Sequence, residues 1–171
     1  LLMRTIPAEG LVIAPSQSDA INEVLQQGCW TDVTRVGQRD GKRTHAQDNS
    51  ERWSFASDKS VSDGFTVLLN DEPQGNIRWS LLGEHNKTNA LNAIAAARHA
   101  GVQPQTAIQA LCEFRGVKRR MEVIYEADNL VAYDDFAHHP TAIRTTLQGL
   151  RAQFSQDEII AIVEPRTHTM S

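Results

Sequence analysis

The sequence predicts an α/β fold, because short apolar runs typical of strands alternate with segments that have helical spacing. A helix from Pro140 to about Arg151 is followed by the apolar run Ile159 to Val163, which is typical of a buried parallel strand. An earlier alanine-rich segment, Asn86 to Ala100, predicts a helix that lies close against a sheet. With Leu130 to Tyr133 as a strand before Pro140, the order strand, helix, strand predicts a right-handed βαβ unit.

The composition is that of an ordinary globular protein, with 40% hydrophobic and 22% charged residues among 171, enough for one domain or parts of two. The net charge of −4 gives no reason to expect nucleic acid or an anionic membrane as a partner. We find no apolar run of membrane-spanning length and no signal peptide, and we expect a cytoplasmic protein with reduced thiols at Cys29 and Cys112. Both ends lie close to strand-like segments, so we expect a fragment.

The first elements are a strand from Leu11 to Ala14 and a helix after it. Ser16 to Asp19 has the character of a capping box, and Gly28 is expected to end the helix in the left-handed conformation. A second strand is expected at Val33 to Val36. The polar segment from Gly37 to Ser50 is expected to be a loop.

Three further strands are expected to form an antiparallel meander: Trp53 to Phe55, Phe65 to Leu69 and Asn76 to Leu81. Residues 70–75 contain Asn, Asp, Pro and Gly, and we expect them to connect the last two strands tightly. Gly101 is expected to end the alanine-rich helix. Pro104 suits the first turn of another helix, which runs to about Leu111.

The character of the sequence changes after Phe114. A basic connector, residues 115–120, leads to a hairpin formed by Val123 to Tyr125 and Leu130 to Tyr133. Phe114 to Lys118 is the candidate hinge, so residues 1–113 and 114–171 are the two expected domains.

The densest group of ionisable side chains is Asp134-Asp135-Phe136-Ala137-His138-His139-Pro140, between the second hairpin strand and the following helix. Carboxylates at a strand end can accept hydrogen bonds from ribose or bind a metal through oxygen. Histidines at a helix start could orient a carboxylate or a phosphate. The plainer interpretation is that the carboxylates cap the helix and the histidines are solvated.

Three other groups could carry chemistry. His85, Asn86 and Asn89 share one helix face, where paired amides can read the edge of a purine or simply cap the helix. Lys118-Arg119-Arg120 could bind phosphate, or be a solvated turn. Glu164-Pro-Arg166-Thr-His168 should leave the next parallel strand at the same sheet edge, where Arg166 would suit a substrate carboxylate; the alternative is a surface loop.

Three motifs in this order resemble the Mur ligase family, the ATP-dependent amide-forming enzymes of peptidoglycan synthesis. The motifs are Gly83-x-His85-Asn86-x-x-Asn89-Ala90, Gly116-Val-x-Arg-Arg120-x-Glu122 and Asp134-Asp-Phe-Ala-His-His-Pro-Thr141. The third resembles the branch that adds to UDP-N-acetylmuramate. A recycling ligase of that branch, whose amine is L-alanyl-γ-D-glutamyl-meso-diaminopimelate, is favoured by Phe136, Thr141-Ala-Ile143 and Glu164-Pro-Arg166-x-x-Thr169-Met170. L-Alanine is the close second.

The resemblance implies that residues 1–113 are the rear of a central ATPase domain and that residues 114–171 begin a Rossmann-like C-terminal domain. It also implies ATP and Mg²⁺ as cofactors, and a reaction in which ATP phosphorylates the muramate carboxylate before the amine attacks. The nucleotide would be contacted by His85, Asn86, Asn89, Arg120 and Asp135, of which Arg120 and Asp135 are the catalytic candidates. The amine pocket would be lined by Phe136, His138, His139 and Arg166.

The family's phosphate loop, its UDP-sugar domain and its metal-binding residues are absent from the sequence, so no metal ligand is assigned. We therefore expect the isolated chain to lack ligase activity. Two other classes stay open. One is a metal-dependent phosphoesterase that uses Asp134, Asp135, His138 and His139 as ligands. The other is a non-catalytic module that binds adenine nucleotides or a partner.

Overall fold

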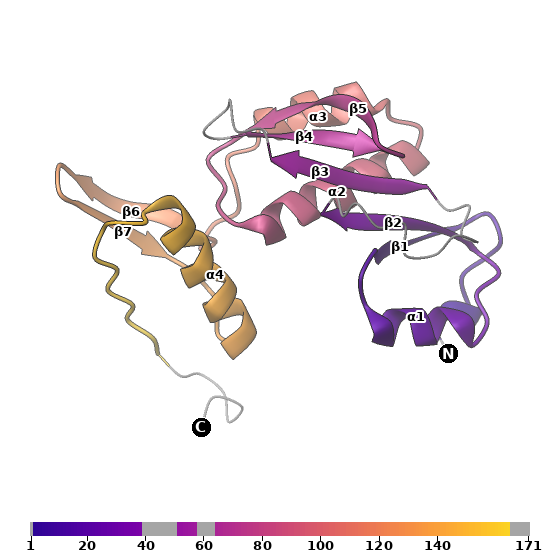
Figure 1. Ribbon diagram of the computed structural model, residues 1–171, viewed down its shortest axis with the longest axis horizontal. Helices are drawn as coiled ribbons and strands as arrows, with labels where there is room; N and C mark the ends of the chain where they lie inside the picture. The colour runs from indigo at the N-terminus through magenta and orange to yellow at the C-terminus, as the bar shows by residue number, and fades with distance from the viewer. Residues whose placement is uncertain (1, 39–50, 58–63, 165–171) are drawn as a thin grey trace. The chain divides into compact units, whose positions relative to one another are not determined.

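The computed structural model describes residues 2–38, 51–57 and 64–164, which divide into two compact units (Figure 1). The first unit comprises Leu1–Trp79 and Lys87–Glu113, and the second comprises Ser80–Asn86 and Phe114–Ser171. The long helix α2, Glu84–His99, therefore begins in the second unit and continues into the first.

The first unit is built on one five-stranded sheet with the order β1-β2-β3-β4-β5 (Figure 1). The first three strands are parallel, and the last three form the antiparallel meander that the sequence predicts. Helix α1 (Asp19–Gln26) connects the parallel neighbours β1 and β2, so the α/β class is confirmed. The strands are β1 (Leu11–Pro15), β2 (Asp32–Gln38), β3 (Arg52–Ser57), β4 (Gly64–Leu69) and β5 (Glu72–Arg78).

The short 3-10 helix Leu2–Arg4 precedes β1, and helix α1 spans Asp19–Gln26. The expected capping box at Ser16 is wrong, because Ser18 is the N-cap residue and its Oγ accepts from the Ile21 amide at 3.4 Å. Ser16 instead donates its hydroxyl to the carbonyl of Val36 in the neighbouring strand at 2.9 Å. Gly28 has φ +125° directly after the helix, as expected for a residue that ends it.

The connection between β4 and β5 is shorter than the predicted segment 70–75. Asn70 and Asp71 have φ +50° and +70° and make a two-residue hairpin turn, so β5 already begins at Glu72. Pro73 is tolerated inside the strand because β5 is the edge of the sheet. Gly75 follows the register shift opposite Val67 and Leu68, where the β5 backbone lies close to helix α3 (Pro104–Cys112).

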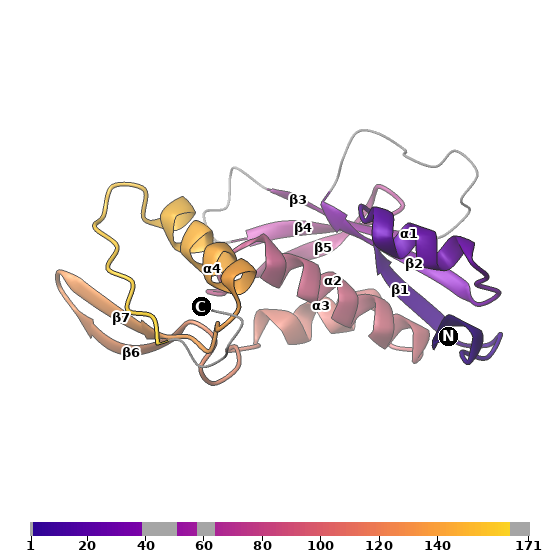
Figure 2. The same cartoon turned by 90° about the horizontal axis from the view of Figure 1, so that it is seen from below.

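Helices α2 and α3 (Pro104–Cys112) lie against one side of the sheet (Figure 2). The α2 face that packs on the sheet consists of Ala90, Leu91, Ile94 and Ala95, all buried. The two small alanines on this face allow the close approach that the sequence predicts. From the sheet, fully buried aromatic side chains such as Trp53, Phe55 and Phe65 complete the core. No helix in the described ranges has both the length and the apolarity needed to cross a bilayer.

The second unit contains the predicted hairpin and the helix that follows it. Strands β6 (Glu122–Ala127) and β7 (Leu130–Asp134) are antiparallel, and helix α4 spans Pro140–Gln153 (Figure 1). Gly149 brings α4 close to the segment before α2, since a Cβ there would lie 3.4 Å from the Cα of Gly83. The entry to α2, the hairpin and α4 thus belong to one body.

The predicted buried strand at Ile159 to Val163 is wrong. Residues 154–164 after α4 form no strand, and no strand in the described part of the chain pairs with them. Ile160 and Ile162 are 78% and 95% exposed. An apolar run becomes a buried parallel strand only where neighbouring strands and covering helices enclose it. The βαβ unit predicted for the second half is therefore not formed among these residues.

Candidate functional site

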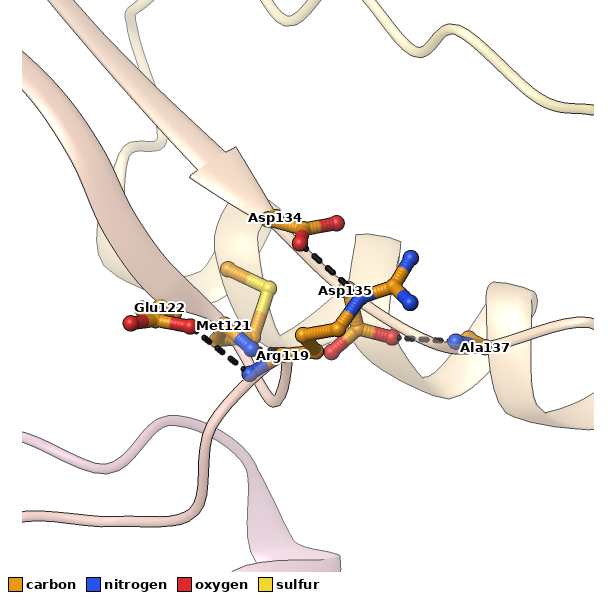
Figure 3. A network of polar contacts seen from close by, with 6 residues as sticks. All are labelled: Arg119, Met121, Glu122, Asp134, Asp135 and Ala137. Carbon is orange, nitrogen blue, oxygen red and sulfur yellow. Dashed lines mark hydrogen bonds and ion pairs between the residues drawn. The ribbon is translucent and has the colours of Figure 1, made fainter.

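The link between β7 and α4 places the Asp/His cluster at one end of the hairpin. Asp135 does not cap α4; its two carboxylate oxygens accept from the backbone amides of Ala137 at 2.8 Å and Met121 at 2.9 Å (Figure 3). These bonds fix the carboxylate between the start of β6 and the end of β7. An ionised carboxylate has about four lone-pair sites, so Asp135 keeps acceptor capacity for a further donor.

Asp134 is bound to the basic connector and also does not cap the helix. Its Oδ2 is 3.1 Å from Nε of Arg119, and both side chains are partly exposed (Figure 3). The Arg119 amide donates to Oε2 of Glu122 at 2.8 Å, and the Arg119 carbonyl accepts from the Phe136 amide at 2.8 Å. Arg119 is therefore held at its backbone and its side chain.

Arg120 lies between Arg119 and Met121, two residues with positive φ, +59° and +52°. It is solvent-exposed, and its guanidinium carbon is 6.0 Å from the centroid of the Phe136 ring. The guanidinium of Arg119 lies 5.5 Å from the same ring. Two cations share one aromatic ring, and only Arg119 of the two pairs with Asp134.

His85, in the first turn of α2, interacts electrostatically with both Asp135 and Arg120. Partial burial lowers the pKa of His85 from its ordinary value, while the Asp135 carboxylate raises it and the Arg120 guanidinium lowers it. All three residues belong to the second unit. One residue from each of the three sequence motifs therefore contributes to the same charged site.

The two asparagines predicted to read adenine, Asn86 and Asn89, differ in their contacts and in the unit to which they belong. The Asn86 side chain donates its Nδ2 to the carbonyl of Leu82 at 2.7 Å, so one of its donors is engaged in the chain itself. Asn89 is exposed on α2 in the first unit. The structure does not bring Asn89 together with Arg120 and Asp135 within one unit, and its adenine contact stays a prediction.

The remaining candidates surround Phe136 or lie elsewhere. The rings of Phe136 and His138 meet edge to face at 5.1 Å, and Nδ1 of His138 is 3.1 Å from the carbonyl of Phe136. His139 is the residue that caps α4, because its Nδ1 accepts from the Thr141 amide at 3.3 Å. Arg166 lies outside the described residues.

The alternative metal site does not assemble. Asp134 and Asp135 are engaged by Arg119 and by backbone amides. Among the residues that the structure describes, no three His, Cys, Asp or Glu side chains are placed to hold a metal ion. The arrangement instead offers an exposed guanidinium, a fixed carboxylate with spare acceptor sites and an imidazole of lowered pKa. Such a set suits a ligand with anionic groups and hydroxyls.

Sequence reasoning missed the polar contacts of Arg119, Met121, Glu122 and Asp134. Glu122 belongs to the second motif, but the motif alone does not predict that its carboxylate binds the Arg119 amide. The left-handed conformation of Arg119 and Met121 has no signal in residue type, since side chains other than Gly, Asn and Asp rarely adopt it. The network therefore becomes visible only when the backbone is known.

Comparison with known proteins identifies related sequences and structures. Residues 119–170 match the family described as "Mur ligase, glutamate ligase domain". The UDP-N-acetylmuramate–L-alanyl-γ-D-glutamyl-meso-2,6-diaminoheptandioate ligase of Escherichia coli K12 is 40% identical over 99% of this chain. The crystal structure of a murein peptide ligase from Psychrobacter arcticus 273-4 is 39% identical and superposes with a TM-score of 0.70, covering 99% of this chain and 34% of that one.

A second kind of relative matches less of the sequence. The UDP-N-acetylmuramate–L-alanine ligase of Caldicellulosiruptor bescii is 43% identical over 66% of this chain and 26% of its own length. The match to the Escherichia coli ligase covers 35% of that protein. The chain thus spans about a third of the length of the curated relatives that it matches over nearly all its residues.

Proposed function

The chain belongs to the Mur ligase family, and from this we propose that it is part of an ATP-dependent ligase that joins L-alanyl-γ-D-glutamyl-meso-diaminopimelate to UDP-N-acetylmuramate. The observation that carries the proposal is the hydrogen bond from the Met121 amide to the Asp135 carboxylate, which joins the second and third family motifs. His85, from the first motif, interacts electrostatically with Arg120 and Asp135. In this proposal residues 1–113 are the rear of the central ATP-binding domain. Residues 114–171 begin the C-terminal ligase domain, which accords with the family match at 119–170.

The described residues fit ATP. Arg120 is exposed and lies on an aromatic ring, so its donors can bind phosphate oxygens. Asp135 is fixed by two backbone amides and keeps acceptor sites for ribose hydroxyls. His85 interacts electrostatically with both groups, and partial burial lowers its pKa. Asn86 and Asn89 would read the adenine edge.

ATP would supply the phosphoryl group that activates the muramate carboxylate toward the amine. Phe136, His138, His139 and Arg166 are proposed to line the amine pocket, with Arg166 binding a substrate carboxylate. Mg²⁺ is part of the proposal for the longer enzyme alone, because the described residues contain no set of ligands for it. We therefore derive no step through the metal ion. A cytoplasmic location, where ATP is available, completes the proposal.

The amine distinguishes the two related ligases. The tripeptide is favoured because two relatives whose names include it align with 99% of this chain. The L-alanine ligase aligns with only 66% of this chain. L-Alanine is the second candidate, on the strength of the 43% identity within that shorter match.

The test is a ligation assay with the full-length protein that carries this chain. ATP, Mg²⁺ and UDP-N-acetylmuramate are supplied with either the tripeptide or L-alanine, and the product is measured by mass spectrometry. We expect ATP-dependent product with the tripeptide and far less with L-alanine. Product with L-alanine alone would reassign the amine, and no product with either amine would overturn the proposed function.

A further inference from the structure

The three consecutive cations 118–120 have different environments. The side chain of Arg119 is paired with Asp134, its amide donates to Glu122 and its carbonyl accepts from the amide of residue 136. Lys118 and Arg120 are exposed, and of these only Arg120 interacts with both Phe136 and His85. The environment of these side chains thus makes Arg120 the cation that faces the proposed nucleotide site.

The turn that presents Arg120 is conformationally unfavourable. Arg119 and Met121 both have positive φ, which is unfavourable for a residue other than glycine. Each of them has its amide bound by a carboxylate, Arg119 by Glu122 and Met121 by Asp135 (Figure 3). Charge-assisted hydrogen bonds of this kind are strong enough to offset that cost.

We propose that Glu122 and Asp134 are positioning residues: they hold the 119–121 turn in its left-handed form and so direct Arg120 to the phosphates of the nucleotide. Glu122 acts on the amide of Arg119, and Asp134 acts on its guanidinium. The inference rests on the proposed function for its ligand, but the geometry of the turn is independent of it. Neither carboxylate touches the nucleotide in this account.

The first part of the test uses the 171-residue chain and NMR. Glu122→Ala removes the acceptor of the Arg119 amide, whereas Glu122→Gln keeps an acceptor oxygen and is the matched control. We expect Glu122→Ala to increase hydrogen exchange at the Arg119 amide about tenfold. We also expect it to raise the pKa of His85, because Arg120 lowers that pKa and would move away. Glu122→Gln should change neither property appreciably.

The second part uses the full-length protein and steady-state kinetics. Glu122→Ala and Asp134→Ala should each raise the KM for ATP about tenfold, the effect of weakening one charge-assisted contact, and should change kcat less. Glu122→Gln should recover most of the affinity lost in Glu122→Ala, because its amide oxygen can still accept from the Arg119 amide. This rescue separates positioning from a general loss of stability.

The outcomes separate the inference from the proposed function. If the wild-type protein performs no ATP-dependent ligation, the proposed function fails, and the NMR measurements alone decide whether Glu122 and Asp134 hold the turn. If the wild-type protein is active and both alanine variants keep its KM for ATP, the positioning roles are refuted. Should Glu122→Ala not fold, the partly exposed Asp134→Ala variant decides the question alone.

Discussion

Replacing Asp135 with alanine should release the backbone amides of Met121 and Ala137 at the same time. Both amides donate to this carboxylate, at 2.9 and 2.8 Å, from segments fourteen and two residues away in sequence. A hydrogen bond to a charged group contributes about 1.5–3 kcal/mol, and we take the lower value because Asp135 is only half-buried. A loss of about 1.5 kcal/mol corresponds to roughly tenfold faster exchange at each amide.

The assay is amide hydrogen exchange followed by NMR in the 171-residue chain. Asp135→Asn keeps one acceptor oxygen, so one of the two amides should keep its protection. Asp128→Ala is the control, since Asp128 is exposed in the turn between β6 and β7 at the other end of the hairpin, and both amides should stay protected. The reasoning is refuted if Asp135→Ala leaves both exchange rates unchanged, or if the two amides already exchange at the unstructured rate in the wild type.

Three further predictions concern stability, activity and adenine recognition. Gly75→Ala should lower the free energy of unfolding of the first unit by about 1–3 kcal/mol, measured in urea, because φ is +150° and the new Cβ would lie 3.3 Å from Ile108. Gly101→Ala is the control: Gly101 also has positive φ but faces open space, so this variant should lose less stability. An equal loss in the two variants would contradict the packing argument. The isolated chain should release no phosphate and form no ligation product from ATP, UDP-N-acetylmuramate and tripeptide, and product formation would show that its sequence suffices. In the full-length protein, Asn89→Ala should weaken ATP binding about tenfold in calorimetry, with Asn92→Ala as the control, and unchanged affinity would remove the adenine assignment.

Local sequence patterns predicted most of the fold because they report the period of each element. The meander, the alanine-rich helix, the 122–134 hairpin and the helix from Pro140 all follow from apolar spacing and turn residues. The errors arise where packing against other elements, rather than the local sequence, determines whether a segment forms a strand. Pro73 and Gly75 normally end a strand, but an edge position and a register shift admit both in β5. The apolar run at 159–163 says nothing about which strand would pair with it.

The site was predictable in its residue types but not in its contacts. Two carboxylates, two histidines and an arginine-rich turn identify a chemically active region. Only the folded backbone shows that Asp135 is held by two amides and that Asp134 is bound to Arg119. His139 rather than a carboxylate caps α4, because the link places its Nδ1 at the Thr141 amide. Such choices depend on φ values that residue type does not specify.

The central claim is that His85, Arg120 and Asp135 form one charged site, and the pKa of His85 tests it most directly. Removing the negative charge with Asp135→Asn should lower this pKa further, because the carboxylate raises it; removing the positive charge with Arg120→Gln should raise it, because the guanidinium lowers it. Proton NMR titration of the imidazole in the 171-residue chain measures both changes. Opposite shifts of these signs are the predicted result, and a His85 pKa that neither substitution moves would contradict the account.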